Sequence, residues 1–128
     1  MSGLPYQGNI EFEILSVDDH SATAKMPVIE GIRNPFGTVH AGAILWFADV
    51  TATVLAMGKM DAAEAEPGFP LAINLSASLI GNVNKGELRA NARFVKKGRR
   101  VTTIRTEVTD ESGRLLVDVT TTHVPSGS

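Results

Sequence analysis

The feature that most constrains this chain is a single long segment with helix-forming composition, residues 40–60. Alanine, leucine and methionine favour an α-helix there, and no proline interrupts the chain before Pro67. Its apolar side chains go nearly all the way round such a helix: Ala41, Ile44, Leu45, Trp46, Phe47, Val50, Val54, Leu55 and Met57. A helix that is apolar all round is buried, so the sequence predicts a central helix from His40 to Met60 that other elements must cover.

The segments on both sides of this helix have the character of β-strands. Two runs, 10–17 and 21–28, precede it and are separated by turn residues. After Pro70, apolar residues alternate with small or polar ones, which predicts four more strands at about 71–79, 88–94, 101–109 and 115–124. We expect an α+β domain in which these four form an antiparallel meander and a strongly curved sheet covers the helix. A ferredoxin-like sandwich is the alternative, but it needs two helices.

Composition narrows the functional classes. The 128 residues fit one domain, 1–128, with a flexible tail at 125–128. A net charge of −2 gives no broad basic field for nucleic acid or an anionic membrane. The chain has no cysteine, and its three histidines lack metal-ligand spacing, so we expect no metal. Since the N-terminus does not resemble a signal peptide and polar residues interrupt the most apolar stretch, we expect a cytoplasmic protein without a membrane span.

The loop from Asn34 to Gly42 leads directly into the N-terminus of the predicted helix. Unpaired N–H groups and the positive end of the helix dipole at such a place stabilise a developing oxyanion. Gly42 and the small Ala41 let a ligand approach the backbone closely. The pattern therefore indicates an anion or carbonyl site. The alternative is that Gly37 and Gly42 are ordinary turn residues before a helix.

Asp49 is the second signal, because it lies mid-helix among apolar neighbours. A carboxylate there is costly to bury without partners, and such groups serve as nucleophiles or general bases. The alternative is a structural aspartate satisfied by a neighbouring hydroxyl, such as that of Thr53. His40 lies nine residues before Asp49, on the opposite side of the helix and about 13 Å away along its axis. If both serve one site, Asp49 must come from a second subunit, which implies two equivalent sites across a two-fold interface.

A basic turn, Lys96-Lys97-Gly98-Arg99-Arg100, is the third signal and holds four of the twelve lysines and arginines. Basic side chains around a turn hold phosphate groups such as those of coenzyme A. The alternative is a solvated hairpin tip. Trp46 and Phe47 either line an acyl pocket or belong to the core, and we favour the core.

The loop and helix together carry a family resemblance, on Asn34, Gly37, His40, Gly42 and Asp49. In this combination and spacing they resemble the hotdog-fold acyl-CoA thioesterases of the phenylacetic acid degradation protein type. The resemblance extends from about residue 10 to 124 and includes Asn74, Gly86-Glu87 and Lys97-Gly98-Arg99. It implies a six-stranded antiparallel sheet wrapped around one long helix, in chains that pair edge to edge as homodimers and assemble to homotetramers. It also implies acyl-CoA or aryl-acyl-CoA substrates, with no cofactor beyond the coenzyme A of the substrate.

By this resemblance Asp49 is the nucleophile or the base that activates water, and the backbone N–H of Ala41 polarises the thioester carbonyl. Asn34 and His40 position the loop and the attacking water or carbonyl. The residues expected to contact the substrate are Gly42, Thr53, Lys97, Arg99 and Arg100.

Two departures from the family pattern keep other functions open. Ala41 replaces the usual glycine after the histidine, and Ala72 lies where some relatives have a serine or threonine that orients water, a role that Thr53 could take instead. The alternatives are a non-catalytic acyl-CoA binding module and a hotdog hydratase or dehydratase, in which a histidine and an acidic residue transfer protons at carbon.

Overall fold

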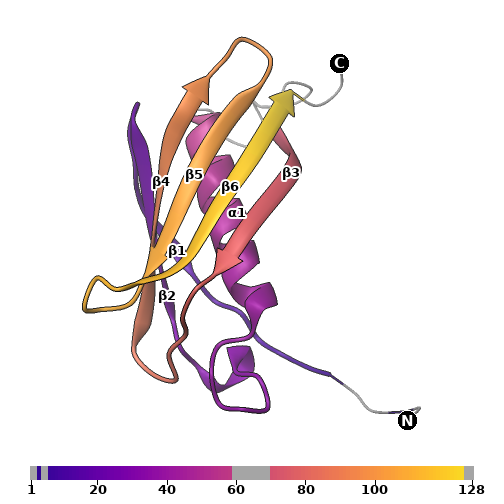
Figure 1. Ribbon diagram of the computed structural model, residues 1–128, viewed down its shortest axis with the longest axis vertical. Coiled ribbons are helices and arrows are strands. Elements are labelled where there is room, and N and C mark those ends of the chain that lie inside the picture. Colours follow the sequence, from indigo (N-terminus) through magenta and orange to yellow (C-terminus); the bar gives the residue numbers. More distant parts are fainter. Residues whose placement is uncertain (1–2, 4–5, 59–69, 126–128) are drawn as a thin grey trace.

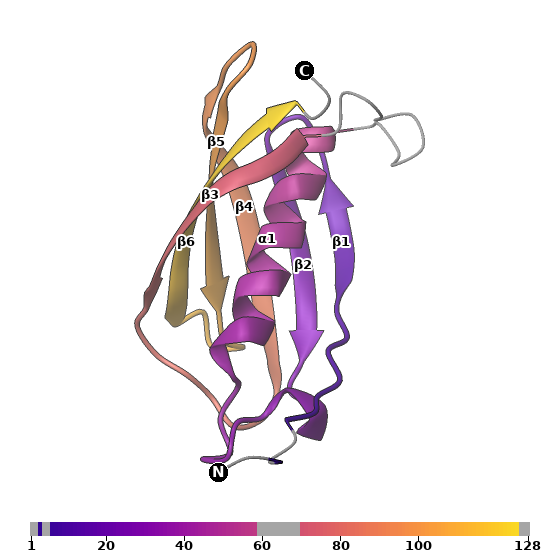
Figure 2. The same cartoon turned by 90° about the vertical axis from the view of Figure 1, so that its right-hand side faces the viewer.

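The computed structural model describes residue 3 and residues 6–58 and 70–125 of the chain. One six-stranded antiparallel sheet curves around a single long helix, α1 (Ala41–Met57), as Figures 1 and 2 show. The strands are β1 (Glu13–Val17), β2 (Ser21–Pro27), β3 (Pro70–Leu79), β4 (Glu87–Lys97), β5 (Thr102–Thr109) and β6 (Leu115–Pro125). A short 3-10 helix, η1 (Glu30–Ile32), precedes α1. The predicted α+β hotdog architecture is confirmed.

The strand order is β1-β2-β4-β5-β6-β3, so β3 lies at the far edge of the sheet beside β6. The prediction that β3 begins a four-strand meander is therefore wrong, although β4, β5 and β6 do form one. Alternation of apolar residues identifies a strand but not its neighbour. The connection 80–86 stays along β6, where Ile80 and Gly81 donate to the Leu116 carbonyl, and it crosses the end of the sheet before β4 begins.

Local interactions determine where α1 begins and where it ends. The helix begins at Ala41 because the His40 side chain caps it, accepting a hydrogen bond from the Ala43 N–H. It ends at Met57, short of the predicted Met60, because Gly58 adopts a φ of 65° and its N–H bonds to the carbonyls of the last turn. Residues 59 and 60 lie outside the described residues. At the other terminus β6 includes Pro125, the first residue of the predicted tail, while 126–128 are not described.

The core lies between the concave face of the sheet and one side of α1. The helix buries these residues there: Ala43, Ile44, Phe47, Ala48, Thr51, Ala52 and Leu55. Alanines on β2 and β4 let the helix approach the sheet closely, and they are Ala22, Ala24, Ala90 and Ala92. Within one chain, however, the sheet covers only part of the helix, since the Trp46 side chain is 48% exposed. The other residues from Ala43 to Met57 are buried or half-buried, in agreement with the predicted central helix.

Strand β3 is the second apolar surface that one chain leaves open. Its alternating residues predict a half-buried strand, but Leu71, Ile73 and Leu79 are all at least half exposed. The strand is also an edge, so its outer backbone groups have no neighbouring strand in the described sheet. Among the described residues no helix has the length and apolar character needed to cross a bilayer.

Candidate active site

Asn34 organises the loop before the helix. Its Oδ1 accepts hydrogen bonds from the N–H groups of Phe36 (2.9 Å) and Thr38 (3.2 Å). Its Nδ2 donates to the Thr38 hydroxyl at 2.8 Å. Gly37, inside this turn, has a φ of 87°, which explains the glycine. Both ends of the Asn34 amide are thus used within the loop, and its role at the site stays a prediction.

Asn82 anchors the same loop and was missed by the sequence analysis. Its Nδ2 donates to the Val39 carbonyl at 2.7 Å, and its Oδ1 accepts from the Val39 N–H at 3.2 Å. Arg114 in turn donates to the Asn82 carbonyl at 3.0 Å. An asparagine in a Gly-Asn-Val-Asn segment is typical of an ordinary turn, so the sequence offers no signal for this pairing across 43 residues.

His40 caps the helix through Nδ1, which accepts from the Ala43 N–H at 3.0 Å. An accepting Nδ1 carries no proton, so the proton of the neutral ring is on Nε2. Gly42 leaves room for this ring, because a Cβ at that position would lie 3.3 Å from the His40 Nδ1.

The backbone N–H groups of Ala41 and Gly42 have no hydrogen-bond acceptor in the described part of the chain, and both residues are exposed. They are free donors of the first helical turn, directed away from the helix body. A carbonyl or an anion placed there would gain both hydrogen bonds and the favourable end of the helix dipole. The arrangement is chemically suited to holding an oxyanion.

Asp49 lies on the side of α1 that faces β3. Its Oδ1 is buried without a hydrogen-bond partner among the described residues, and no hydrogen bond joins it to Thr53. The structural alternative, a carboxylate satisfied by Thr53, therefore has no support in this chain. Asp49 instead borders a pocket of about 360 Å³, whose other lining residues are Val50, Thr53, Val54, Met57, Leu71 and Ala72. Among the described lining residues, the Asp49 carboxylate and the Thr53 hydroxyl are the only polar side chains.

The sequence-predicted residues form three separate groups in one chain. Asn34, His40, Ala41 and Gly42 lie at the N-terminal end of α1, whereas Asp49 and Thr53 line the pocket beside β3. Lys97 is the last residue of β4, and Arg99 and Arg100 lie in the exposed turn that follows, at the opposite end of the sheet from the helix N-terminus (Figure 1). One chain alone therefore does not bring the proposed oxyanion donors to Asp49.

His123 is a further residue near this pocket that the sequence analysis considered only as a metal ligand. It lies on β6 opposite Ala72 of β3 and is 1% exposed. Its Nε2 lies 2.8 Å from the Thr121 hydroxyl. Burial lowers the pKa of His123, while the Pro70 carbonyl and the charge of Asp49 oppose that shift. The residues before it on the inward face of β6 are Val117, Val119 and Thr121, so this histidine stands out in its strand.

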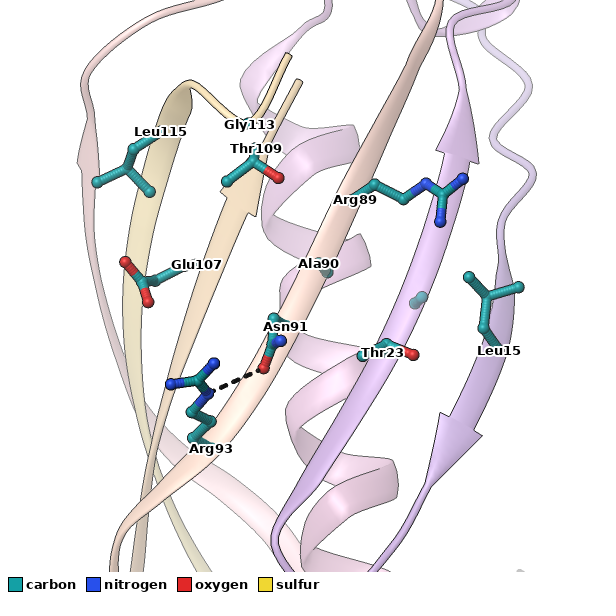
Figure 3. A pocket seen from close by; sticks show the side chains of 11 residues that line it. Leu15, Thr23, Arg89, Ala90, Asn91, Arg93, Glu107, Thr109, Gly113 and Leu115 are labelled. Carbon is teal, nitrogen blue, oxygen red and sulfur yellow. Dashed lines mark hydrogen bonds between the residues drawn. The ribbon is translucent and has the colours of Figure 1, made fainter. Parts of the chain in front are cut away.

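A depression of about 450 Å³ on the outer face of the sheet is a different surface. Figure 3 shows Arg89, Asn91 and Arg93 of β4 and Glu107 of β5 around it, with α1 behind the sheet. Arg93 donates to Asn91 there at 3.3 Å. None of the sequence-predicted site residues lines this depression, and the sheet separates it from Asp49.

Comparison with known families identifies a match over much of the chain. Residues 36–117 match the family model described as the thioesterase superfamily. The match begins within the loop that precedes α1 and includes the helix with Asp49, β3, β4 and β5, and it covers more than half of the chain.

Individual proteins are similar over much of the chain. A 1,4-dihydroxy-2-naphthoyl-CoA hydrolase of Listeria monocytogenes is 26% identical over 110 residues, 86% of each protein. A Deinococcus radiodurans protein described as a candidate esterase is 31% identical over 78% of this chain, which corresponds to only 60% of the length of that protein. A hypothetical thioesterase of Streptococcus pneumoniae, solved with coenzyme A, shares the fold with a TM-score of 0.78 at 17% identity, covering 92% of this chain and 90% of its own.

Proposed function

Because the chain belongs to the thioesterase superfamily, we propose that it hydrolyses acyl-CoA thioesters to the free acid and coenzyme A. The observation that carries this proposal is Asp49, a carboxylate with an unpartnered buried oxygen beside a mostly apolar pocket. The unpaired backbone N–H groups of Ala41 and Gly42 supply hydrogen-bond donors for the carbonyl oxygen of the substrate. The Listeria relative, whose name is that of a CoA hydrolase, supports the reaction class.

In this mechanism the thioester carbonyl accepts hydrogen bonds from the helix N-terminus, and water attacks the carbonyl carbon. Asp49 takes the proton from the water, the negative charge on the oxygen is held by the N–H groups of Ala41 and Gly42, and the C–S bond then breaks. The proton passes to the coenzyme A thiolate, which regenerates the carboxylate. Direct attack by Asp49 on the carbonyl, with an anhydride later hydrolysed by water, is the alternative route.

We propose an acyl-CoA thioesterase of the phenylacetic acid degradation type, with aryl-acyl-CoA thioesters among its substrates and a cytoplasmic location. The aryl substrate in the name of the Listeria relative supports this choice. Release of free thiol from phenylacetyl-CoA, a second aryl-acyl-CoA and straight-chain acyl-CoAs tests it. Saturable binding of all of them without thiol release would instead favour an acyl-CoA binding module.

The working unit that we propose is a homodimer, which further associates to a homotetramer. The exposed edge and apolar side chains of β3, together with the uncovered side of α1, form a surface suited to a second copy. Antiparallel pairing of the two β3 strands about a two-fold axis makes the two α1 helices antiparallel. In this dimer the Asp49 of each chain lies nearer to the helix N-terminus of its partner than to that of its own chain.

A charged residue on β3 is expected to separate the subunits. Ile73→Lys should give a folded monomer by light scattering with little thioesterase activity, since Ile73 is already 59% exposed in one chain. Val95→Lys is the matched control, because Val95 is 62% exposed on β4, away from this edge. A wild-type protein that is monomeric at its working concentration and fully active would contradict the dimer.

The basic turn is expected to contribute to coenzyme A affinity more than to turnover. In the antiparallel dimer the turn of one chain lies toward the helix N-terminal end of its partner. Replacing Lys97, Arg99 and Arg100 by alanine should raise KM roughly 3- to 30-fold, as three exposed charge contacts would, with kcat nearly unchanged. The increase should shrink as salt is added.

A matched control removes the same charge from the outer face of the sheet, by replacing Arg89, Arg93 and Arg105 with alanine. This control variant should keep the wild-type KM. An equal rise of KM in both triple variants would mean that net charge, and not the turn, attracts the substrate.

A further inference from the structure

Two buried polar atoms lack hydrogen-bond partners in the described part of the chain, the Asp49 Oδ1 and the His123 Nδ1. A carboxylate oxygen is an acceptor, and a ring nitrogen that carries a proton is a donor. Buried polar atoms are rarely left unsatisfied, because each loses its interaction with water on folding. The two atoms are therefore complementary in chemistry.

The fold places the two side chains on elements that face each other, α1 and β6. Ala72 of β3 lines the pocket with Asp49, and its register partner on β6 is His123. Paired residues on adjacent antiparallel strands project to the same face of the sheet, so His123 faces α1 as Ala72 does. The charge of Asp49 is close enough to raise the pKa of the ring, against the effect of burial.

Thr121 fixes the histidine ring from the other side. It lies two residues earlier on the same face of β6, and its hydroxyl is 2.8 Å from the His123 Nε2. A hydroxyl that donates to Nε2 leaves the ring proton on Nδ1, the atom that has no partner. The Pro70 carbonyl also lies beside the ring and is a second possible acceptor for that proton.

We propose that His123 is a positioning residue for Asp49: Thr121 donates to Nε2, and Nδ1–H donates to the Asp49 Oδ1, which fixes the carboxylate so that its other oxygen faces the pocket. The ring stays neutral and takes no proton in the reaction. This inference rests on the proposed hydrolase function, since it assigns His123 to the group that activates water there. The contact between the two side chains can nevertheless be measured without any activity.

Nitrogen NMR of the ¹⁵N-histidine-labelled protein tests the contact directly. The signal of His123 is identified by its loss in His123→Asn, and we expect the tautomer with the proton on Nδ1. Asp49→Asn should shift the Nδ1 resonance of His123 and leave that of the exposed His20 unchanged. A proton on Nε2, or a His123 signal that is insensitive to Asp49→Asn, would overturn the proposal and favour the Pro70 carbonyl as the acceptor.

Kinetics test whether the contact serves the reaction. His123→Leu should lower kcat by about 10- to 100-fold, the scale for disorienting an acid–base group, with KM within about two-fold of wild type. His123→Asn should recover much of this loss, because an asparagine amide reaches nearly the same point as Nδ1. In an Asp49→Asn background, His123→Leu should cause no further loss, since residues that act as one unit are not additive.

The outcomes separate this proposal from the proposed function. If the losses in kcat multiply in the double variant, His123 only supports the fold. The same conclusion follows if His123→Asn is as slow as His123→Leu while the urea midpoint is unchanged. If wild-type protein releases no thiol from any acyl-CoA tested, the hydrolase function fails, and the NMR experiment alone decides whether His123 holds Asp49.

Discussion

Asp49→Asn is expected to preserve the fold and to lower turnover by about 10²–10⁴-fold, the usual scale for losing a positioned acid–base group. An asparagine has nearly the same size as aspartate but cannot take a proton from water or attack a carbonyl. An asparagine oxygen can still accept a hydrogen bond from His123, and the substitution removes a charge that is costly to bury, so the urea midpoint should stay unchanged or rise. Thiol release and urea unfolding measure the two effects.

Glu107→Gln is a matched control for this variant. Glu107 is a half-buried carboxylate on the outer face of the sheet, where it lines the depression of Figure 3. Its amide variant should hydrolyse acyl-CoA at the wild-type rate. An Asp49→Asn protein that is less stable but retains its turnover per folded site would show that Asp49 is structural, and the hydrolytic mechanism would need another base.

Mixing His40→Ala chains with Asp49→Ala chains is expected to restore about a quarter of wild-type activity, although each variant alone is nearly inactive. Random exchange makes about half of the dimers mixed, and each mixed dimer contains one site in which an intact His40 faces an intact Asp49. The expectation follows from the positions of the two residues at the end and in the middle of one helix. Thiol release after subunit exchange measures the recovery.

The capping role of His40 requires a second variant in this experiment. Its Nδ1 accepts from the Ala43 N–H, so His40→Ala also removes a helix cap, which typically costs about 1 kcal/mol. His40→Asn keeps an acceptor at the N-cap and should preserve stability while still losing activity. A fully active His40→Asn protein would limit His40 to capping. No recovery in the mixture, despite proven subunit exchange, would remove the shared site.

Local sequence patterns determined the secondary structure of this protein, because helices and strands depend on residues that are close together in the chain. The apolar composition of residues 40–57 predicts the helix, and alternation predicts the strands, since both depend on near neighbours in the chain. The glycine-containing loop and Asp49 predict a candidate site for the same reason, because each is recognised from its neighbours in the chain. The family resemblance supplied the fold and the reaction class, and the family match over residues 36–117 agrees with both.

Gly58 marks the limit of such patterns even at short range. The composition of residues 58–60 permits a longer helix, but Gly58 adopts a positive φ of 65°, outside the α-helical region, and α1 ends before it. A glycine can either continue a helix or end it, and the choice depends on the backbone that follows.

Only the tertiary structure decided the pairings between residues distant in the chain. β3 lies beside β6 and not β4, since strand periodicity carries no information about which edge a strand joins. That choice exposes the apolar residues of β3 and brings His123 opposite Ala72, within reach of the charge of Asp49. Asn82 likewise holds Val39 across 43 residues. Such contacts depend on how the sheet closes around the helix, whereas the helix and the strands themselves follow from the side chains along each segment.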